Sequence, residues 1–210
     1  MADLLIGNRP SSLHQERLNV VQEILVASDV KTVLDLGCGR GPLMVRLAQT
    51  ARFDRLVGVD ISTCALHSLD RKLASIGSER CKISLIRGSF MDPTLDLSGF
   101  DAAIMVETIE HIAPERLASV EGAVFRRHRP RTVVITTPNR DWNDRLGVPK
   151  YRYRHRDHRF EWGRLKFRSW AERLATRNRY RVCFQEIGQE DIACGGASQM
   201  ACFSLIPHDQ

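Results

Sequence analysis

The stretch that decides the fold is Thr32-Val33-Leu34-Asp35-Leu36-Gly37-Cys38-Gly39-Arg40-Gly41, an apolar run that leads directly into three alternate glycines. The run predicts a buried strand over residues 32–36, and a helical pattern follows at residues 43–49. Glycines between a strand and a helix let the backbone turn tightly and approach a ligand, which the N–H groups at the start of the helix then face. The stretch therefore predicts a nucleotide-binding loop.

Strand-like apolar runs alternate with helix-like periodic runs along the rest of the chain, which is typical of a parallel α/β sheet. Further strands are expected at residues 55–60, 82–86, 101–106, 132–136, 181–187 and 199–206. Further helices are expected at residues 13–27, 62–76, 114–125 and 162–178. The predicted fold class is α/β, a doubly wound, seven-stranded, mostly parallel sheet with an antiparallel terminal strand. No linker or repeat divides the 210 residues, so we expect one domain with an Arg-rich insertion at about residues 138–161.

Charge is segregated along the chain. The formal net charge is +6, but residues 126–181 alone carry 18 Arg and Lys against 5 Asp and Glu. Arginine predominates, and its planar guanidinium suits bidentate contacts to phosphate. Such a concentration favours binding of a polyanion, with a solvated basic face as the alternative.

Several classes of protein are excluded by composition. No run of about 18 apolar residues is present, so we expect no membrane-spanning helix. Residues 1–6 lack the basic and apolar regions of a secretory signal. The six cysteines are scattered without a C-x-x-C pair and read as buried or half-buried thiols. We therefore expect a reducing, cytoplasmic location.

An acidic residue completes the nucleotide-binding pattern. Asp60 ends the second predicted strand, 23 residues after Gly37, where a carboxylate can accept hydrogen bonds from ribose hydroxyls. The G-x-G-x-G spacing differs from that of dinucleotide binders and of P-loops. It resembles the S-adenosylmethionine site of class I methyltransferases. That resemblance implies that the cofactor is held by Asp35, Gly37, Gly39, Gly41 and Asp60, with Ser89 and Phe90 near its adenine.

A second polar cluster follows the strand at residues 101–106. Glu107, Glu110 and His111 are spaced so that one helical turn would place all three on one side. Oxygen and nitrogen ligands without thiolates favour magnesium or manganese over structural zinc. The alternative is a solvated first helical turn, where acids are favoured by the helix dipole.

The insertion contains two further candidate ligands, His155 and His158, within the run Arg152-Tyr153-Arg154-His155-Arg156-Asp157-His158-Arg159-Phe160-Glu161-Trp162. Neighbouring arginines disfavour the charged imidazole, whereas a neutral imidazole can ligate a metal. The alternative for each histidine is stacking or phosphate binding. A stacking surface for a terminal base is expected from Tyr151, Tyr153, Phe160 and Trp162. Phe167 and Trp170 are expected in the core, and Trp142 is undecided.

Taken together, the Glu-x-x-Glu-His motif, Thr137-Pro138-Asn139 and the Asp-His-x-Phe-Glu-Trp stretch resemble the small-RNA 3′-terminal ribose 2′-O-methyltransferases. The resemblance covers nearly the whole chain. It implies that Glu107, Glu110, His111 and His158 bind Mg²⁺ or Mn²⁺ and serve catalysis, with His155 as the less favoured substitute. Arg40 departs from the pattern, since the family often has an acidic or small residue there.

The implied reaction is metal-dependent methyl transfer from S-adenosylmethionine to the 2′-hydroxyl of the 3′-terminal nucleotide of RNA. The arginines of the insertion would bind its phosphates: Arg140, Arg152, Arg154, Arg156 and Arg159. The implied partners are an RNA 3′ end and RNA-repair or small-RNA-processing proteins. Two alternatives stay open, a metal-dependent O-methyltransferase acting on a small diol and a non-catalytic RNA-binding subunit.

Overall fold

The computed structural model describes residues 12–77 and 80–207, so residues 1–6 lie outside the described part. The sheet has seven strands in the order β3-β2-β1-β4-β5-β7-β6. These strands are β1 (Thr32–Leu36), β2 (Arg55–Asp60), β3 (Lys82–Arg87), β4 (Ala102–Val106), β5 (Thr132–Pro138), β6 (Tyr180–Asp191) and β7 (Gly195–Leu205). Every predicted strand is present. The first five are parallel, and β7 pairs antiparallel with both β5 and β6, as predicted for the terminal hairpin.

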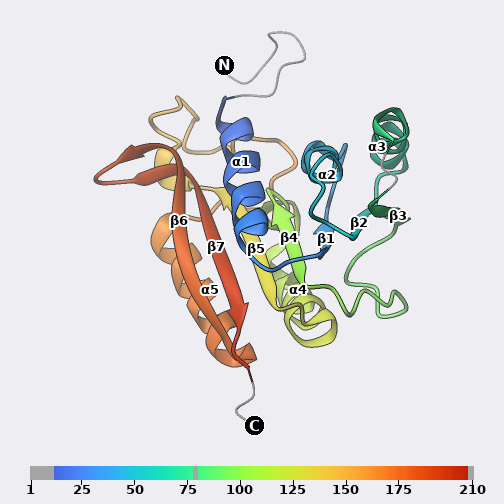
Figure 1. Ribbon diagram of the computed structural model, residues 1–210. Helices are drawn as coiled ribbons and strands as arrows, with labels where there is room; N and C mark the ends of the chain where they lie inside the picture. The colour runs from blue at the N-terminus through green and yellow to red at the C-terminus, as the bar shows by residue number, and fades with distance from the viewer. Residues whose placement is uncertain (1–11, 78–79, 208–210) are drawn as a thin grey trace.

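Helices cover both faces of the sheet (Figure 1). One face packs against α1 (Ser12–Ala27), α2 (Pro42–Ala48) and α3 (Thr63–Ile76), whose leucines meet the apolar side chains of the central strands. The other face packs against α4 (Leu117–Glu121) and α5 (Arg164–Asn178). Two separate apolar layers therefore enclose the sheet, as the doubly wound fold requires.

The helix expected over residues 114–125 is interrupted. The segment forms a 3-10 turn, η2 (Pro114–Arg116), then α4, then the wider turns of η3 (Gly122–His128). The N–H of Arg129 reaches back five residues to the carbonyl of Val124. Val124, Phe125 and His128 in this segment are buried.

The insertion at residues 138–161 is largely irregular and contains one short 3-10 turn, η4 (Arg140–Trp142), shortly after β5. Another short 3-10 turn, η1 (Ile109–His111), follows β4. The register aligns Val106 with Thr136, so both strands end at the same edge. Figure 1 shows the amber segment between β5 and α5 looping over this end of the sheet, beside the start of α1. The predicted catalytic segments are thereby brought to one edge.

Two remaining expectations concern cysteines and membranes. No described cysteine forms a disulfide, and Cys38 and Cys81 are buried, as expected. The expectation is wrong for Cys64, in the first turn of α3, and for Cys183, on edge strand β6, because both are exposed where neighbouring elements do not cover them. Among the described helices, none is long and apolar enough to cross a membrane.

Candidate active site

The glycine loop between β1 and α2 leaves an opening at its middle. Gly37 has a φ of +82°, and a Cβ there would lie 2.6 Å from Thr108 Cγ2. Gly39 has a φ of +55°, and a Cβ there would meet no atom within 4 Å. The outer glycine Gly41 packs against Leu69. The loop is therefore fixed at both ends by close packing while its centre faces free space, the arrangement expected where a ligand approaches the backbone.

Two carboxylates lie beneath this loop. Asp60 accepts the N–H of Gly39 at 2.8 Å and the N–H of Ser62 at 2.7 Å, one on each oxygen. Each oxygen retains capacity for another donor, so the predicted contact with a ribose remains open. Burial, and then the neighbouring charge of Asp60, raise the pKa of Asp35 to about 7. A cationic group bound here would restore the charged form of Asp35, which suits the positive sulfonium and ammonium of S-adenosylmethionine.

The segment after β3 forms the adjoining wall. Phe90 is buried, and its carbonyl accepts a hydrogen bond from His128 Nε2 at 3.0 Å. Ser89 accepts the N–H of Met91 at 3.2 Å, which closes the turn. Sequence reasoning missed Ile61, which follows Asp60 and is 76% exposed. An exposed apolar side chain beside the nucleotide loop offers a surface for a base, and its position directly after the acidic residue was the available signal.

The two glutamates are not on one helical face, which corrects the sequence expectation. Glu107 precedes η1 and has a φ of +52°, so its side chain leaves the backbone in a different direction from those of the turn. Its carboxylate accepts hydrogen bonds from Thr136 at 3.0 Å and Ser198 at 3.2 Å, and lies 3.5 Å from Arg17 Nη2. Such strained backbone is typical of functional sites.

Glu110 is fully buried, and one of its two carboxylate oxygens is unpartnered. Its Oε2 accepts a hydrogen bond from Thr137 at 3.0 Å, whereas Oε1 has no partner. Desolvation, followed by the charge of Glu107, raises the pKa of Glu110 well above its usual value. A buried oxygen without a donor is unfavourable unless a cation or donor reaches it.

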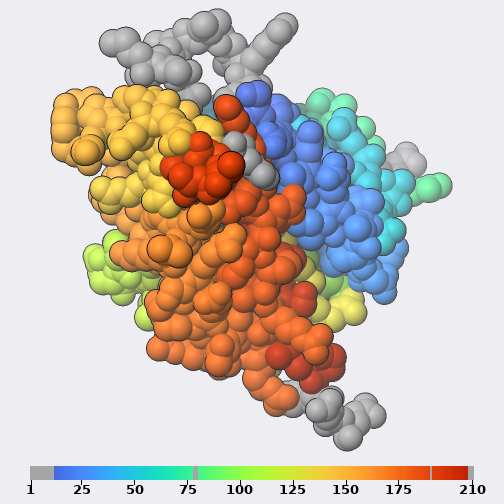
Figure 2. All heavy atoms as spheres, turned by 90° about the vertical axis from the view of Figure 1, so that its left-hand side faces the viewer, coloured from blue at the N-terminus to red at the C-terminus, as the bar shows by residue number. Residues whose placement is uncertain are grey.

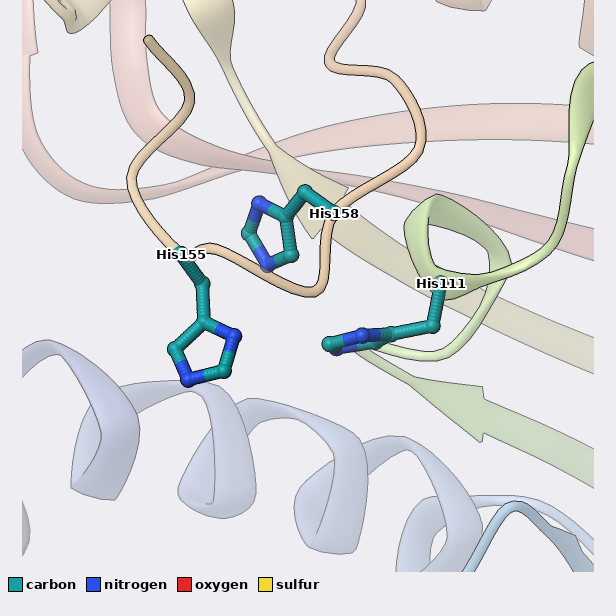
Figure 3. Close-up of side chains that lie close together, drawn as sticks. All are labelled: His111, His155 and His158. Atoms are coloured by element: carbon teal, nitrogen blue, oxygen red, sulfur yellow. The ribbon is translucent and has the colours of Figure 1, made fainter.

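Three imidazoles converge above η1. His111, His155 and His158 each offer a nitrogen within 4.8 Å of the others, and Figure 3 shows the rings turned toward one another from η1 and the insertion loop. The ring centroids of His111 and His158 are 4.9 Å apart. The N–H of Arg159 donates to the carbonyl of Glu110 at 2.7 Å, which fastens the loop to η1. Of the predicted ligands, this set contains His111 and His158 but neither glutamate.

The hydrogen bonds distinguish the two histidines of the insertion. Nδ1 of His158 lies 2.6 Å from Glu161 Oε1, which assigns the proton to Nδ1 and leaves the Nε2 lone pair free. Nδ1 of His155 instead accepts the N–H of Asp157 at 3.2 Å, so this lone pair is occupied. These hydrogen bonds leave the Nε2 lone pair of His158 free toward the cluster, which favours His158 over His155 as the candidate ligand.

Arg154 has a different role from the one predicted. Its guanidinium donates to Asn143 Oδ1 and to the carbonyls of Ala197 and Asn139, and its N–H donates to Glu161 at 2.7 Å. All three guanidinium nitrogens are therefore engaged within the protein, so Arg154 is not available to phosphate. It links η4, the tip of the β6–β7 hairpin and the carboxylate that orients His158.

The other predicted RNA contacts are exposed at the surface: Arg140, Arg152, Arg156 and Arg159. A cavity of about 370 Å³ opens in the insertion. It is lined by Arg140, Asp141, Asn143, Asp144, Val148, Pro149, Lys150 and Arg152. Both cations and acids line it, so it is a polar cavity of mixed charge.

The aromatic residues divide into two groups. Tyr151 is 83% exposed and Tyr153 38% exposed, as a stacking surface requires. The expectation is wrong for Phe160 and Trp162, which are buried and pack against each other. Helix α5 covers them, as Trp170 also contacts Trp162. The core residues Phe167 and Trp170 are confirmed, and the undecided Trp142 is buried, with its indole N–H donating to Gly195.

Sequence reasoning also missed the contribution of α1. Arg17 is half-buried beside Glu107, and its Nε has no hydrogen-bond partner. One turn earlier, His14 has a lowered pKa because of burial and then the charge of Arg17. The three-residue spacing of His14 and Arg17, on the helix preceding the glycine loop, was the signal that placed them on one face.

The chain is similar in sequence to known methyltransferases. A family model described as a methyltransferase domain matches residues 33–131. The small RNA 2′-O-methyltransferase of Mus musculus is 35% identical over 183 residues, which cover 84% of this chain and 46% of the relative. The chain thus spans about half the length of that curated relative.

Solved structures give the same result. The solved methyltransferase domain of bacterial CtHen1 is 38% identical in sequence, with a TM-score of 0.83. The match covers 93% of the present chain and 100% of the CtHen1 chain. The solved structure of the small RNA methyltransferase HEN1 is 28% identical in sequence, with a TM-score of 0.86. The match covers 98% of the present chain and 28% of the HEN1 chain. The chain therefore has the S-adenosylmethionine-dependent methyltransferase fold and belongs to the family of small-RNA 2′-O-methyltransferases.

Proposed function

We propose that the protein transfers a methyl group from S-adenosylmethionine to the 2′-hydroxyl of the 3′-terminal nucleotide of RNA, and that the reaction depends on a divalent cation. The names of its relatives indicate the reaction class, and the side chains of the site supply the reason for a metal. The observation that carries the proposal is the cluster of three converging imidazoles, together with the unpartnered, buried Oε1 of Glu110 on η1, the same turn that carries His111.

The residues present fit Mg²⁺ or Mn²⁺. A carboxylate oxygen without a donor and neutral imidazoles form a donor set of oxygen and nitrogen atoms. The pKa of His111 is lowered by burial and then by His158 and His155, so its imidazole is neutral at neutral pH. We assign Glu107, Glu110, His111 and His158 as the residues that would hold the cation, with rearrangement of Glu107 from its present hydrogen bonds.

The two bound groups supply distinct chemistry. S-adenosylmethionine supplies a methyl group on a positively charged sulfur, and a divalent cation lowers the pKa of a hydroxyl that it ligates. The chain's own residues align the reactants. The glycine loop, Asp35 and Asp60 hold the cofactor, and the edge at η1 holds the ribose. Alignment of this kind contributes at most about 7–11 kcal/mol to lowering the barrier. No dedicated general base is assigned, and the hydroxyl proton leaves to water or to a neighbouring imidazole.

Specificity for the terminal nucleotide follows from the diol. Only the last nucleotide of an RNA carries adjacent free 2′- and 3′-hydroxyls, and a cation held at this edge would engage both. The exposed cations Arg140, Arg152, Arg156 and Arg159 would contact the phosphates behind it. Tyr151 and Tyr153 offer a surface for the terminal base.

The test uses methyl-labelled S-adenosylmethionine and RNAs that differ only at their end, in the presence of Mg²⁺ or Mn²⁺. Transfer to RNA with a free terminal diol, together with loss on 2′-deoxy, 3′-deoxy and periodate-oxidised ends, supports the proposal. Transfer to oxidised RNA would overturn the terminal assignment, and undiminished transfer in a chelator would overturn the metal. Methylation of a small diol without RNA would favour the alternative enzyme class. Association with RNA-repair or small-RNA-processing proteins stays a prediction.

A further inference from the structure

The positive charge lies mostly outside the insertion. Residues 138–161 hold seven of the cations but also four acids. Residues 164–181 hold seven cations against the single acid Glu172. The larger excess of positive charge therefore belongs to α5 and the start of β6.

Three of these cations form a stripe along α5, which we call the α5 stripe: Lys166, Arg173 and Arg177. All three are exposed. Spacings of seven and four residues place them on one side of a helix with 3.6 residues per turn, over about 16 Å. Ser169 and Thr176, also exposed, lie on the adjoining surface and add hydroxyl groups. The stripe presents several consecutive donors in a row.

Few acids neutralise this stripe. The carboxylate of Glu186 on β6 lies 3.1 Å from Arg168 and 3.9 Å from Arg164, so those two arginines are partly compensated. Within the described residues, no carboxylate lies within 4.0 Å of Lys166, Arg173 or Arg177. The α5 stripe therefore retains its charge for a ligand.

The α5 stripe also begins beside the candidate active site. Helix α5 starts six residues after His158, and Trp162, two residues before the helix, accepts the N–H of Arg140 through its carbonyl. The far end of α5 lies at the opposite edge of the sheet, where Asn178 accepts a hydrogen bond from Arg129. Figure 2 shows the orange surface of α5 and β6 directly below the amber insertion. The stripe thus leads away from the site along the outside of the molecule.

We propose that the α5 stripe binds the phosphates of the RNA that lie upstream of the 3′-terminal nucleotides. This inference rests on the proposed function, because that function places the RNA end at η1. A phosphate backbone entering there meets the stripe next, and its evenly spaced negative charges match a row of cations better than a folded acidic protein does. The insertion then holds the end of the RNA and α5 holds its body.

The experiment compares an RNA of three nucleotides with one of twenty, using wild-type protein and the triple variant K166E/R173E/R177E. The KM for the long RNA should rise at least tenfold, while kcat and the KM for the trinucleotide, which does not reach α5, should stay within twofold. The matched control is R71E/R80E/K82E, which makes the same charge change on exposed residues of the α3–β3 edge. The control should retain the wild-type preference for long RNA.

A milder variant, K166Q/R173Q/R177Q, guards against misfolding and gives a second readout. Three phosphate contacts to a single strand add about 2 to the salt slope, the slope with which log affinity for RNA falls against log salt concentration. Between 50 and 200 mM salt the wild type should therefore lose about twentyfold more affinity for the twenty-nucleotide RNA than this variant. If the α5 variants weakened the use of both RNA lengths equally, or if R71E/R80E/K82E weakened the use of the long RNA as much as K166E/R173E/R177E does, the proposal would be overturned. If the wild type methylates neither RNA, the proposed function fails, and direct binding of the twenty-nucleotide RNA still decides the stripe. Binding of an acidic peptide or anionic vesicles but not of RNA would also overturn it.

Discussion

The two ends of the candidate site are built in different ways. The cofactor end is the glycine loop with Asp35 and Asp60, and the histidine end is the cluster of His111, His155 and His158. The glycine loop is formed by neighbouring residues of one strand–loop–helix unit, and its shape follows from glycines at positive φ. The histidine end is assembled from η1, the insertion and the β6–β7 hairpin, which are far apart in the sequence. It is held by hydrogen bonds between these segments, such as those of Arg154 to Asn139 and Ala197. The first region takes its shape mainly from local glycines, which also pack against Thr108 and Leu69, whereas the second is assembled wholly from distant segments.

The largest effect is expected from removal of the unpartnered carboxylate. Glu110→Gln should reduce turnover by about 10³-fold, because a lost metal ligand removes several kcal/mol of transition-state stabilisation. The Tm should not fall, since the buried carboxylate itself destabilises the fold. Turnover, Mn²⁺ binding by electron paramagnetic resonance and Tm are measured together. The control Glu115→Gln, on exposed η2, should match the wild type. Unchanged turnover in E110Q would refute the metal assignment.

Substitutions of the two histidines of the insertion should differ clearly in their effect on Mn²⁺ affinity. His158→Ala is expected to lower Mn²⁺ affinity by more than about 100-fold, because its free Nε2 faces the cluster. His155→Ala should lower it by less than about tenfold, since its Nδ1 is already occupied by the N–H of Asp157. Titration of Mn²⁺ into each variant measures the difference. Equal losses, or a reversed order, would make His155 the ligand.

The link to the hairpin is tested at Arg154. Arg154→Lys should weaken Mn²⁺ binding by about 10–100-fold, because the compact ammonium group of lysine cannot span the three acceptors that the guanidinium reaches, and Glu161 then orients His158 less well. Binding of S-adenosylhomocysteine, measured by calorimetry, should be unchanged. The control Arg156→Lys alters a side chain that is 91% exposed and should affect neither ligand. A loss of cofactor affinity in R154K would show that the two ends are not independent.

A pH dependence of cofactor binding should follow from Asp35. The folded pKa of Asp35 is raised to about 7, so its carboxyl group is neutral below that pH. If the cationic cofactor favours the charged form, binding releases a proton and affinity for S-adenosylmethionine should fall by up to tenfold for each pH unit below about 7, and level off above. Calorimetry between pH 5 and 8 tests this slope. Asp35→Asn should remove it, and a slope retained in D35N would assign it to another group.

The same linkage applies to stability. The unfolded pKa of Asp35 is near 3.8, so without cofactor its ionisation destabilises the protein progressively between about pH 4 and pH 7, and the cost persists above. In D35N this part of the pH dependence of Tm should be absent. A larger Tm increase on cofactor binding at pH 8 than at pH 5 is the matching expectation for the wild type.

The smallest effect concerns the exposed arginines of the insertion. Replacing Arg140 or Arg156 by Gln should reduce the salt slope of RNA binding by about 0.7 each, since each lost contact releases fewer counterions. Fluorescence anisotropy with a short RNA at several salt concentrations measures the slope. An unchanged slope in both variants would remove these residues from the RNA contacts.

The sequence predicted the cofactor end well because its signals are local. The strand over residues 32–36, the loop with Gly37 and Gly39, and the position of Asp60 were all read from short-range spacing, and the observed strand bounds match. The strand order was accessible for the same reason, since alternation of strand and helix leaves few topologies.

The histidine end was predicted by residue type but not by arrangement. Helical spacing suggested a shared face for Glu107 and Glu110, but the positive φ of Glu107 depends on its contacts with β5 and β7. Arg154 could not be told from its exposed neighbours, because its acceptors come from three separate segments. Likewise the burial of Phe160 and Trp162 depends on α5, which lies later in the chain.

The position of β7 between β5 and β6 has a consequence for how the protein matures. Asn139, Trp142 and Arg154 bond to main-chain groups at residues 194–197, which leave the ribosome after the whole insertion. The glycine loop packs against Thr108 and can form once β4 has been made, whereas the insertion must wait for the final strand to enter the sheet. In a nascent chain the glycine loop should therefore take its final shape before the histidine end, whose supporting contacts are complete only after β7 has been made.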